Sequence, residues 1–283
     1  MQTNFEHCVT LVREADHDRY LATLFAPAER RDALYALYAF NVEIARVREL
    51  ARQPMPGEIR LQWWREALAG ERESEAAANP VAAAMRETMS RYEISADRLI
   101  ELIDARAFDL YDEPMASLHD LDAYARGTQA TLLQIAAEIL AGKKAPADAL
   151  IQHAGIAHAV AAVLSLLGRH TARRQLYVPL EVLERYKATA SDVFAMETDA
   201  PLLAALAELR RHARRQLAAA AAELPSAPAE ILPALLPLAL TGPTLQRMER
   251  QDYEPFQFMS PSRLSRQWTL WRAAKKPARI FKA

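Results

Sequence analysis

The chain is poor in glycine, and this limits the folds that it can adopt. Only seven of its 283 residues are glycine, well below the usual ~7%. Turn-rich β folds need glycine at positions of positive φ, so such folds are disfavoured. Alanine, leucine, arginine and glutamate dominate the sequence instead, and all four are strong helix formers. We therefore expect an all-α protein.

Charge and cysteine content exclude further classes of protein. The formal net charge is −1, which argues against bulk electrostatic binding of nucleic acid. Cys8 is the single cysteine, so an internal disulfide and a cysteine metal cluster are excluded, and we expect this side chain to be buried. No apolar signal segment and no run of ~18 apolar residues is visible. We therefore expect a cytoplasmic protein.

Apolar periodicity predicts a series of helices along the chain. Residues 28–50 read as one long helix, which Pro54 follows closely. Residues 147–168 read as a very apolar helix that we expect to be buried on most sides. The other predicted helices are 3–15, 57–69, 80–91, 95–111, 117–140, 179–187, 199–223 and 228–240.

The organisation of the chain favours a single domain over residues 1–283. Three short breaks interrupt the helical pattern without a change in composition, at 141–147, 188–200 and 224–230. Residues 244–283 form a tail in which Trp268, Trp271 and Phe281 are interleaved with basic residues. Such a tail is typical of contact with an anionic membrane surface, and an exposed basic terminus explains it equally well.

Five segments, read in order, resemble the squalene/phytoene synthase family. The resemblance covers roughly residues 16–190 and implies an all-α isoprenoid-synthase helical bundle. Members of this family join two prenyl diphosphates head to head, and they hold the diphosphates with Mg²⁺ bound by two acidic motifs. The segments are RYLATLFAPAERRDALYALYAFN (19–41), LQWWREALAG (61–70), PVAAAMRETMSRYEISADRLIELIDARAFDL (80–110), LDAYARGTQATLLQIAAEIL (121–140) and RRQLYVPLEVL (173–183).

The first acidic motif departs from the family pattern. Two adjacent aspartates of the family correspond here to Ala45 and Arg46, and a family arginine corresponds to Val42. Only Glu49 keeps a carboxylate in register. Glu43 lies six residues earlier, about 240° around a helix of 3.6 residues per turn, so the two carboxylates cannot face one ion together.

The second acidic motif departs further. Alignment on the YVP segment (177–179) places Arg169 and His170 where the family has an acidic pair, and Leu166 where it has an earlier aspartate. No Asp or Glu occurs anywhere in residues 149–180. Mg²⁺ prefers hard oxygen ligands, so we expect no metal site, no catalytic residue and no cofactor. Mg²⁺ would be required only if the chain is an enzyme after all.

Loss of both motifs on a retained scaffold resembles a divergent branch of the family, the complex I (NADH dehydrogenase) assembly factors of squalene/phytoene-synthase type. The phrases that carry this resemblance are AFNVEIA, LQWWREAL, GTQATLLQIAAEIL and the late DYEPF…LWR. It implies a non-catalytic protein that acts in assembly of respiratory complex I. Its partners would be complex I subunits or an assembly intermediate, on the cytoplasmic side of the inner membrane and in peripheral contact with it.

Two alternatives stay open. The first is a head-to-head prenyltransferase, which would need carboxylates from unexpected positions such as Glu43, Glu49 and Glu138. The second is a prenyl-lipid binding protein that keeps the old pocket as an apolar cavity. In that case phosphate would be bound by arginine without metal.

Arg169, Arg173 and Arg174 are the candidate substrate-binding residues, although a solvated basic loop explains them as well. A second group, Trp63, Trp64 and Arg65, is a candidate partner-binding site, because Trp and Arg are favoured anchors at interfaces. Neighbouring side chains on a helix point about 100° apart. One tryptophan can therefore lie in the core while the other meets a partner, and burial of both is the competing interpretation.

Asp16, His17 and Asp18 are adjacent in sequence, so their side chains splay apart rather than converge on a metal ion. We interpret this segment as a solvated helix junction. Within it, Asp18 would cap the following helix or pair with Arg19.

Overall fold

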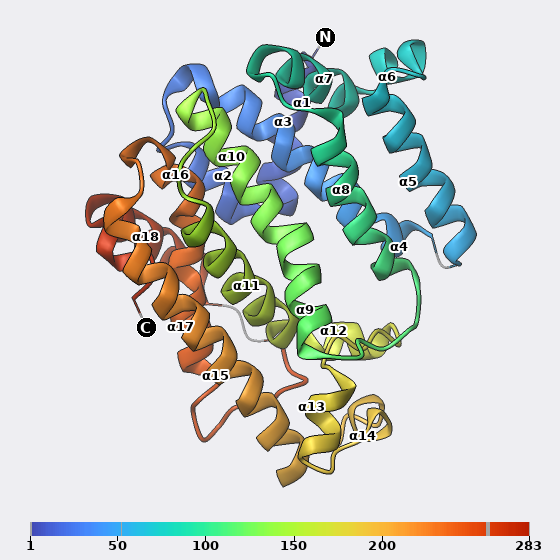
Figure 1. Ribbon diagram of the computed structural model, residues 1–283, viewed down its shortest axis with the longest axis vertical. Helices are drawn as coiled ribbons and strands as arrows, with labels where there is room; N and C mark the ends of the chain where they lie inside the picture. Colours follow the sequence, from blue (N-terminus) through green and yellow to red (C-terminus); the bar gives the residue numbers. More distant parts are fainter. Residues whose placement is uncertain (1, 52, 259–260, 283) are drawn as a thin grey trace. The chain divides into compact units, whose positions relative to one another are not determined.

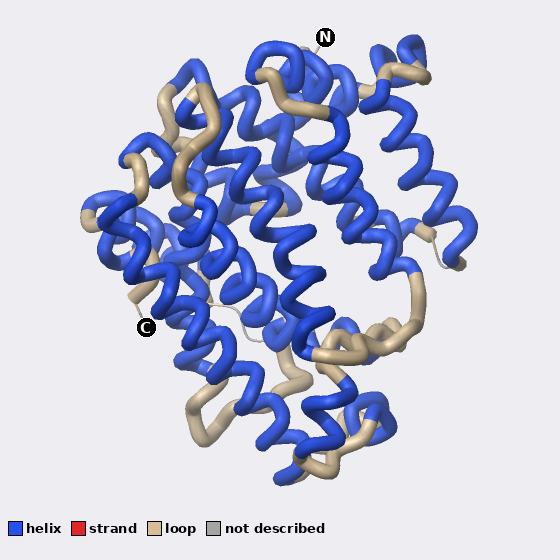
Figure 2. The backbone as a smooth tube through the Cα atoms, viewed as in Figure 1, coloured by secondary structure: helices blue, strands red, loops and turns tan. Residues whose placement is uncertain are grey.

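The computed structural model is made of α-helices joined by short 3₁₀ and π segments and loops (Figure 2). It describes residues 2–51, 53–258 and 261–282. Within these residues every regular element is helical and no strand occurs, which confirms the all-α prediction. The chain divides into two compact units. That they form a single domain remains a prediction.

Unit 1 comprises Met1–Leu110, Thr131–Pro146 and Ala227–Pro237. Its elements can be followed by label in Figure 1. They are α1 (Asn4–Ala15), α2 (His17–Thr23), α3 (Ala28–Ala45), α4 (Val47–Leu50), α5 (Pro54–Ala69), α6 (Glu73–Ala78), α7 (Pro80–Tyr92), α8 (Ala96–Ala107), η1 (Phe108–Leu110), α10 (Thr131–Ala141), η4 (Ala229–Ile231) and α16 (Leu232–Leu235).

Unit 2 comprises Tyr111–Ala130, Ala147–Ser226 and Leu238–Ala283. The 3₁₀ segment η5 (Leu236–Leu240) straddles the boundary of the two units in sequence. The other elements are α9 (Leu118–Ala125), the π segment η2 (Arg126–Ala130), α11 (Asp148–Ser165), α12 (Leu167–Ala172), α13 (Leu180–Arg185), α14 (Ala190–Phe194), α15 (Ala200–Glu223), η3 (Leu224–Ser226), α17 (Thr241–Arg247), α18 (Arg263–Lys275) and η6 (Pro277–Arg279).

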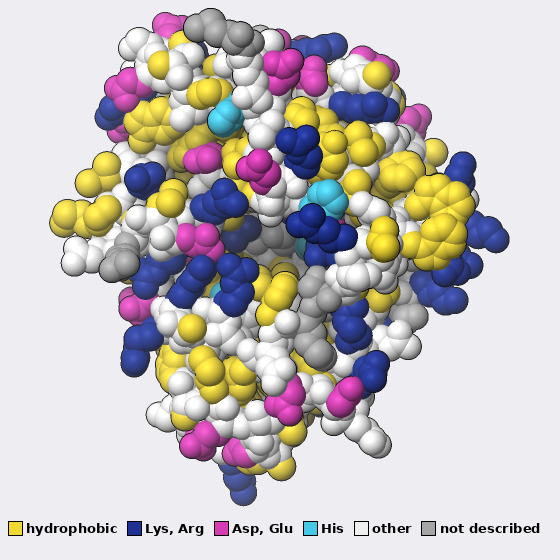
Figure 3. Space-filling view, turned by 180° about the vertical axis from the view of Figure 1, so that it is seen from behind, with side chains coloured by type: hydrophobic (Ala, Val, Ile, Leu, Met, Phe, Trp, Pro, Cys, Tyr) yellow, Lys and Arg dark blue, Asp and Glu magenta, His cyan; other side chains and the backbone are white. Residues whose placement is uncertain are grey.

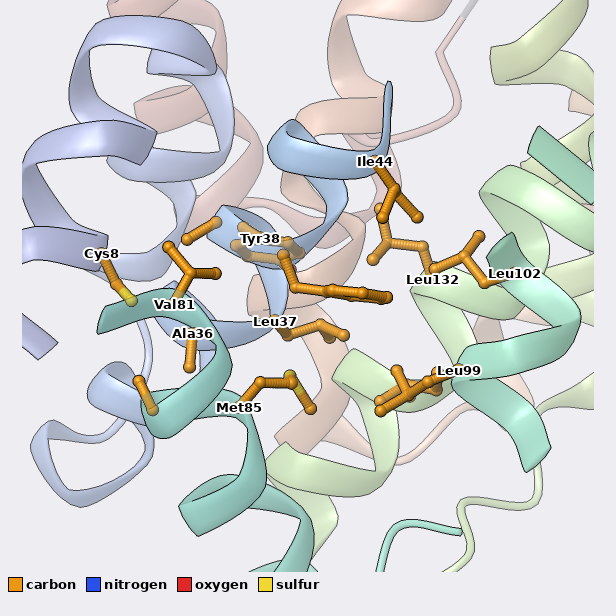
Figure 4. Close-up of a cluster of buried hydrophobic side chains, with 14 of the residues drawn as sticks. Cys8, Ala36, Leu37, Tyr38, Ile44, Val81, Met85, Leu99, Leu102 and Leu132 are labelled. Atoms are coloured by element: carbon orange, nitrogen blue, oxygen red, sulfur yellow. The ribbon is translucent and has the colours of Figure 1, made fainter. Parts of the chain in front are cut away.

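Helix α3 is the centre of unit 1. It packs against α1, α7 and α10, and α1 also packs against α7. Phe40, Leu37 and Ala36 of α3 are completely shielded from solvent. Figure 4 shows the cluster, in which Cys8 and Met85 belong to the same buried set. Burial of apolar surface on several sides of one helix is the main favourable contribution to this fold.

Helix α11 is the centre of unit 2. It packs against α15, α17, α9 and η2, and eleven of its residues are buried, as the prediction for residues 147–168 required. Gly155 allows a close approach of η2 to α11, because a Cβ atom at this position would lie 2.7 Å from the backbone N and Cα of Ala130. The π segment that ends at Ala130 therefore packs directly on the backbone of α11.

Several helix boundaries differ from the predictions. The predicted helix 28–50 breaks at Arg46, which separates α3 from the short α4. The predicted helix 117–140 is interrupted by the π segment η2. The predicted break at 188–200 contains α14, whose start is fixed by a capping box between Thr189 and Asp192. Composition alone favours helix throughout 28–50 and 117–140, so these interruptions reflect tertiary packing.

Within the described residues, no helix combines the length and the apolar composition that spanning a bilayer requires.

The close approach at Gly155 gives a test of unit 2. Alanine is ordinarily better than glycine in a helix by up to about 1 kcal/mol. Gly155→Ala should instead lower the free energy of unfolding by about 1–3 kcal/mol, because the new Cβ overlaps backbone atoms that cannot rotate away. Urea unfolding followed by circular dichroism measures the change.

Gly57→Ala in α5 is the matched control, since its Cβ would meet only side-chain atoms of Leu110. We expect a smaller loss there. A Gly155→Ala variant more stable than the parent would contradict the described packing of α11 on η2.

The burial of Cys8 gives a test of unit 1. Burial raises the pKa of the Cys8 thiol from 9.0 to about 12. Above pH ~9 the unfolded chain therefore releases a proton that the folded chain retains, so stability falls as pH rises from ~9 towards ~12, by up to about 1.4 kcal/mol per pH unit. Urea unfolding of the parent and of Cys8→Ala across this range should show a shallower alkaline loss in the variant. Equal slopes would mean that the thiol is open to solvent.

Candidate functional site

The first candidate region is the end of α3 in unit 1. Ala45 is the last residue of the helix and Arg46 is its C-cap. Val42 is buried, Ala45 is half-buried and Arg46 is exposed. The side chains at these three positions are therefore apolar or cationic. Glu49 lies beyond the break, in the first turn of α4, and is exposed.

The second candidate region is the end of α11 and the short α12 in unit 2. Ser165, the last residue of α11, donates its hydroxyl hydrogen bond to the Ala161 carbonyl at 2.8 Å. Arg169 is exposed, whereas His170 is half-buried. The ring centroid of His170 lies 4.6 Å from that of the buried Tyr177. His170 thus packs on Tyr177 of the YVP segment.

The three candidate arginines do not share one environment. Arg169, Arg173 and Arg174 are all exposed. Arg174 has a left-handed backbone (φ 57), and its guanidinium lies 5.4 Å from the ring centroid of Phe194. That contact is a cation–π interaction within unit 2. Phosphate binding by these arginines remains a prediction.

The nearest carboxylate after this basic segment already has a structural partner. Glu181 Oε1 accepts the backbone N–H of Leu118 at 2.8 Å, at the start of α9. The YVP segment itself is tied to the residues before α9, because Met115 donates to Leu176 O and Leu180 donates to Met115 O. Glu181 is therefore used to order the loop before α9.

A buried ionic cluster in unit 1 was not identified from the sequence. Arg19 is 9% exposed, and its Nη1 lies 2.5 Å from Asp16 Oδ2. The guanidinium also lies 5.5 Å from the ring centroid of Tyr38 on α3. Burial disfavours the Arg19 cation, but the Asp16 carboxylate and Tyr38 together outweigh this and hold the pKa of Arg19 above its ordinary value. Burial likewise raises the pKa of the Tyr38 hydroxyl.

Arg106 and Asp109 extend this cluster. Their side chains are largely buried, and Arg106 Nη1 lies 3.2 Å from Asp109 Oδ2. The charge of Arg106 acts on Arg19 and opposes its protonated form. Two guanidinium groups and two carboxylates thus balance one another. Such a set orders the polypeptide where it is desolvated. The sequence carries no local signal for the burial of Arg19, because polar residues (His17 and Asp18) separate it from Asp16.

The helix junction at residues 16–18 differs in detail from the prediction. Asp16, rather than Asp18, is the N-cap of α2, and its side chain accepts the backbone N–H of Arg19. The same carboxylate pairs with the Arg19 guanidinium. The cap lies one turn before Arg19, so a single aspartate serves both contacts.

Trp63, Trp64 and Arg65 all make contacts within unit 1. Trp64 is 4% exposed, and its ring packs edge-on against Phe40, with centroids 5.2 Å apart. The half-buried Trp63 donates its indole N–H to Glu75 at 2.9 Å. Arg65 pairs with Asp104 at 2.7 Å. Trp64 therefore contributes to the core, and partner binding by these three residues remains a prediction.

In the part of the chain that the structure describes, no three His, Cys, Asp or Glu side chains gather closely enough to hold an ion. The two histidines of α11 have partners within unit 2. His153 Nδ1 lies 2.6 Å from Gln216 Oε1, and His158 Nδ1 lies 3.2 Å from Thr241 Oγ1.

Comparison with known proteins shows the family to which the chain belongs and the fold that it shares. Residues 12–272 match the squalene/phytoene synthase family. The chain belongs to that family. The crystal structure of squalene synthase HpnC from Alicyclobacillus acidocaldarius superposes with a TM-score of 0.76 at 23% identity, covering 89% of this chain and 95% of that chain. The isoprenoid-synthase fold predicted from the sequence is thereby confirmed.

Two curated relatives carry different names. NADH dehydrogenase (ubiquinone) complex I, assembly factor 6 of Rattus norvegicus is 29% identical over 250 residues, covering 88% of this chain and 75% of that protein. The 15-cis-phytoene synthase of Synechococcus elongatus is 24% identical over 209 residues, covering 67% and 65%. The chain therefore has relatives that are named as assembly factors and a relative that is named as an enzyme.

The ionic cluster generates a prediction about stability. Asp16→Asn keeps an N-cap oxygen for α2 but removes the charge that faces the buried Arg19. We expect the free energy of unfolding to fall by about 3 kcal/mol, because Arg19 then loses its closest carboxylate and the cluster keeps two guanidinium groups for one carboxylate. Thermal or urea unfolding at neutral pH measures it.

Asp252→Asn is the control, because Asp252 pairs with Arg250 where both side chains are mostly exposed (67% and 64%). That change should cost at most about 1 kcal/mol. Equal losses at the two sites would contradict a structural role for the Asp16–Arg19 pair.

Proposed function

We propose that this protein is a non-catalytic member of the squalene/phytoene synthase family that acts in assembly of respiratory complex I. The observation that carries the proposal is the chemistry of residues 149–180, which contain no Asp or Glu. The family binds Mg²⁺ with two acidic motifs, and the carboxylates of the second motif would have to come from this segment. Its charged side chains are cationic instead.

Release of the diphosphate leaving group depends on metal ions. A prenyl diphosphate is strongly anionic. When the diphosphate group leaves, the prenyl group becomes a carbocation, and Mg²⁺ favours this step by neutralising the charge of the departing diphosphate. Mg²⁺ requires carboxylate oxygens. At the end of α3 the aligned positions hold Ala45 and Arg46, and at α12 they hold Arg169 and His170. Cationic side chains at these points would repel a divalent ion.

The pattern of relatives supports the assembly role. The assembly factor of Rattus norvegicus matches over 88% of this chain, whereas the phytoene synthase of Synechococcus elongatus matches over 67%. On this proposal, the protein acts on complex I subunits or on an assembly intermediate at the cytoplasmic side of the inner membrane. The retained helical scaffold would then serve binding rather than turnover.

A head-to-head prenyltransferase is the competing function, and the family membership and the named phytoene synthase relative favour it. It would require carboxylates from outside the two aligned segments. Glu138 illustrates the difficulty, because its carboxylate pairs with Arg98 and also accepts a hydrogen bond from Gln134 at 3.0 Å. A prenyl-lipid binding role is the third proposal and would use arginine in place of metal.

A product assay separates these functions. Purified protein is incubated with farnesyl or geranylgeranyl diphosphate, Mg²⁺ or Mn²⁺, and NADPH, and the extract is analysed by mass spectrometry beside an active squalene synthase. We expect no squalene, phytoene or cyclopropyl intermediate, because the ions lack paired carboxylates.

Glu49→Gln is the matched variant for this assay, because Glu49 is the one carboxylate that keeps the register of the first motif. Product formed by the parent and lost in Glu49→Gln would overturn the non-catalytic proposal. Metal-independent binding of farnesyl diphosphate that is lost when Arg169, Arg173 and Arg174 are changed to Gln would favour the lipid-binding role.

A further inference from the structure

Helix α18 exposes large apolar side chains on its outer side. The exposed fractions are 77% for Leu264, 57% for Trp268 and 44% for Trp271. At ~100° per residue these positions lie within about 60° of one another, opposite the buried Leu270 and Ala273. We call these three residues the tryptophan face.

The two indole rings of this face are ordered against each other. Their centroids are 4.9 Å apart and their planes differ by 16°, so the rings are stacked. Phe281, which the sequence groups with these tryptophans, is 4% exposed and belongs to the interior of unit 2. Among the described residues of the tail, the exposed aromatic side chains are therefore Trp268 and Trp271 of α18 and Phe258, which precedes the helix and is 58% exposed.

A basic pocket lies next to the tryptophan face. It has a volume of about 200 Å³ and shares α18 with the face, because Thr269 and Arg272 directly follow Trp268 and Trp271. No acidic side chain lines it, and its three cations have no ion pair with any described residue. The lining residues are Ala239, Pro243, Thr269, Arg272, Arg279 and Lys282.

The charge around α18 has a single sign. Residues 261–282 contain seven Lys and Arg residues and no Asp or Glu, while the whole chain has a formal net charge of −1. Figure 3 shows this side, where hydrophobic side chains protrude at the right edge and Lys and Arg side chains lie directly beside them. A concentrated positive patch on a nearly neutral chain attracts an extended anionic surface.

We propose that α18 docks on an anionic lipid bilayer, with the tryptophan face in the headgroup boundary and a lipid phosphate in the basic pocket. Indole rings are favoured at the membrane interface, where an apolar ring meets a polar layer. Cations beside an apolar helix face add attraction to anionic lipids. This inference is independent of the assembly role, because it concerns only the surface of unit 2.

The arrangement suits a helix that lies in the plane of the membrane. Lys275 continues the line of Trp268 and Trp271 by one further turn, and its long side chain can keep its charge among the headgroups. The basic pocket opens on the neighbouring flank of α18, at the level of the headgroup phosphates. Its volume suits a phosphate group rather than an acyl chain.

Co-sedimentation with vesicles tests the docking surface. The full chain is mixed with vesicles of phosphatidylcholine alone or of phosphatidylcholine with phosphatidylglycerol, and the pelleted fraction is measured at low and high salt. We expect binding to the anionic vesicles that weakens with salt. Trp268→Ala with Trp271→Ala should reduce it at least about tenfold. Arg272→Gln with Arg279→Gln and Lys282→Gln should remove the preference for anionic lipid.

Two matched controls use other exposed positions. Met55→Ala with Ile59→Ala removes apolar side chains that are 74% and 64% exposed in unit 1. The triple variant Lys143→Gln, Lys144→Gln and Lys187→Gln removes three exposed charges that do not belong to α18 or to the basic pocket. Both control variants should bind anionic vesicles as the parent does. Circular dichroism and thermal unfolding confirm that each variant is folded.

Four results would overturn the proposal. The first is parent protein that stays in the supernatant with anionic vesicles. The second is a loss of binding that is as large in the control variants as in the α18 variants. The third is a protein that binds inorganic phosphate in the basic pocket but no vesicle, which would assign the pocket to a free anion. Self-association through the tryptophan face, seen as a dimer that the Trp268→Ala and Trp271→Ala changes dissolve, also excludes lipid docking.

Discussion

The packing of α3 is the constraint on which unit 1 depends. The helix is enclosed by α1, α7 and α10, and eleven of its residues are buried. The volume of the core limits which side chains these positions accept, because a packed core tolerates little change of shape. The last residue, Ala45, and the C-cap, Arg46, lie at the edge of that core. The chemistry at the helix end can therefore change while the packing that defines the fold is retained.

In unit 2, too, the residues that form the core differ from the residues of the candidate site. Helix α11 is held against α15 and η2 by buried apolar residues and by the close approach at Gly155. The aligned positions of the second acidic motif lie after it, where Arg169 is exposed and His170 rests on Tyr177. Such an arrangement explains how membership of an enzyme family is compatible with a proposed role that needs no metal.

The sequence predicts the features that depend on composition and periodicity. The low glycine content predicts the all-α fold, and the apolar stretch 147–168 predicts that α11 is buried. The burial of Cys8, the single cysteine, is likewise expected from the sequence. The break at Arg46 is not predictable in this way, because helix-forming residues continue on both sides of it. The basic pocket is not predictable either, since it joins Ala239 to Lys282 across a large separation in sequence. The burial of Arg19 depends similarly on contacts that its neighbours do not encode.

The most direct test of the assembly role is a deletion of the gene in its own host. NADH:quinone oxidoreductase activity and the amount of assembled complex I are measured in isolated membranes, with succinate:quinone activity as the control for an intact chain. The account predicts that NADH:quinone activity and assembled complex fall while succinate:quinone activity is unchanged, and that both are restored by the parent chain and by Glu49→Gln. Unchanged complex I, together with the loss of a squalene- or phytoene-type product, would contradict it.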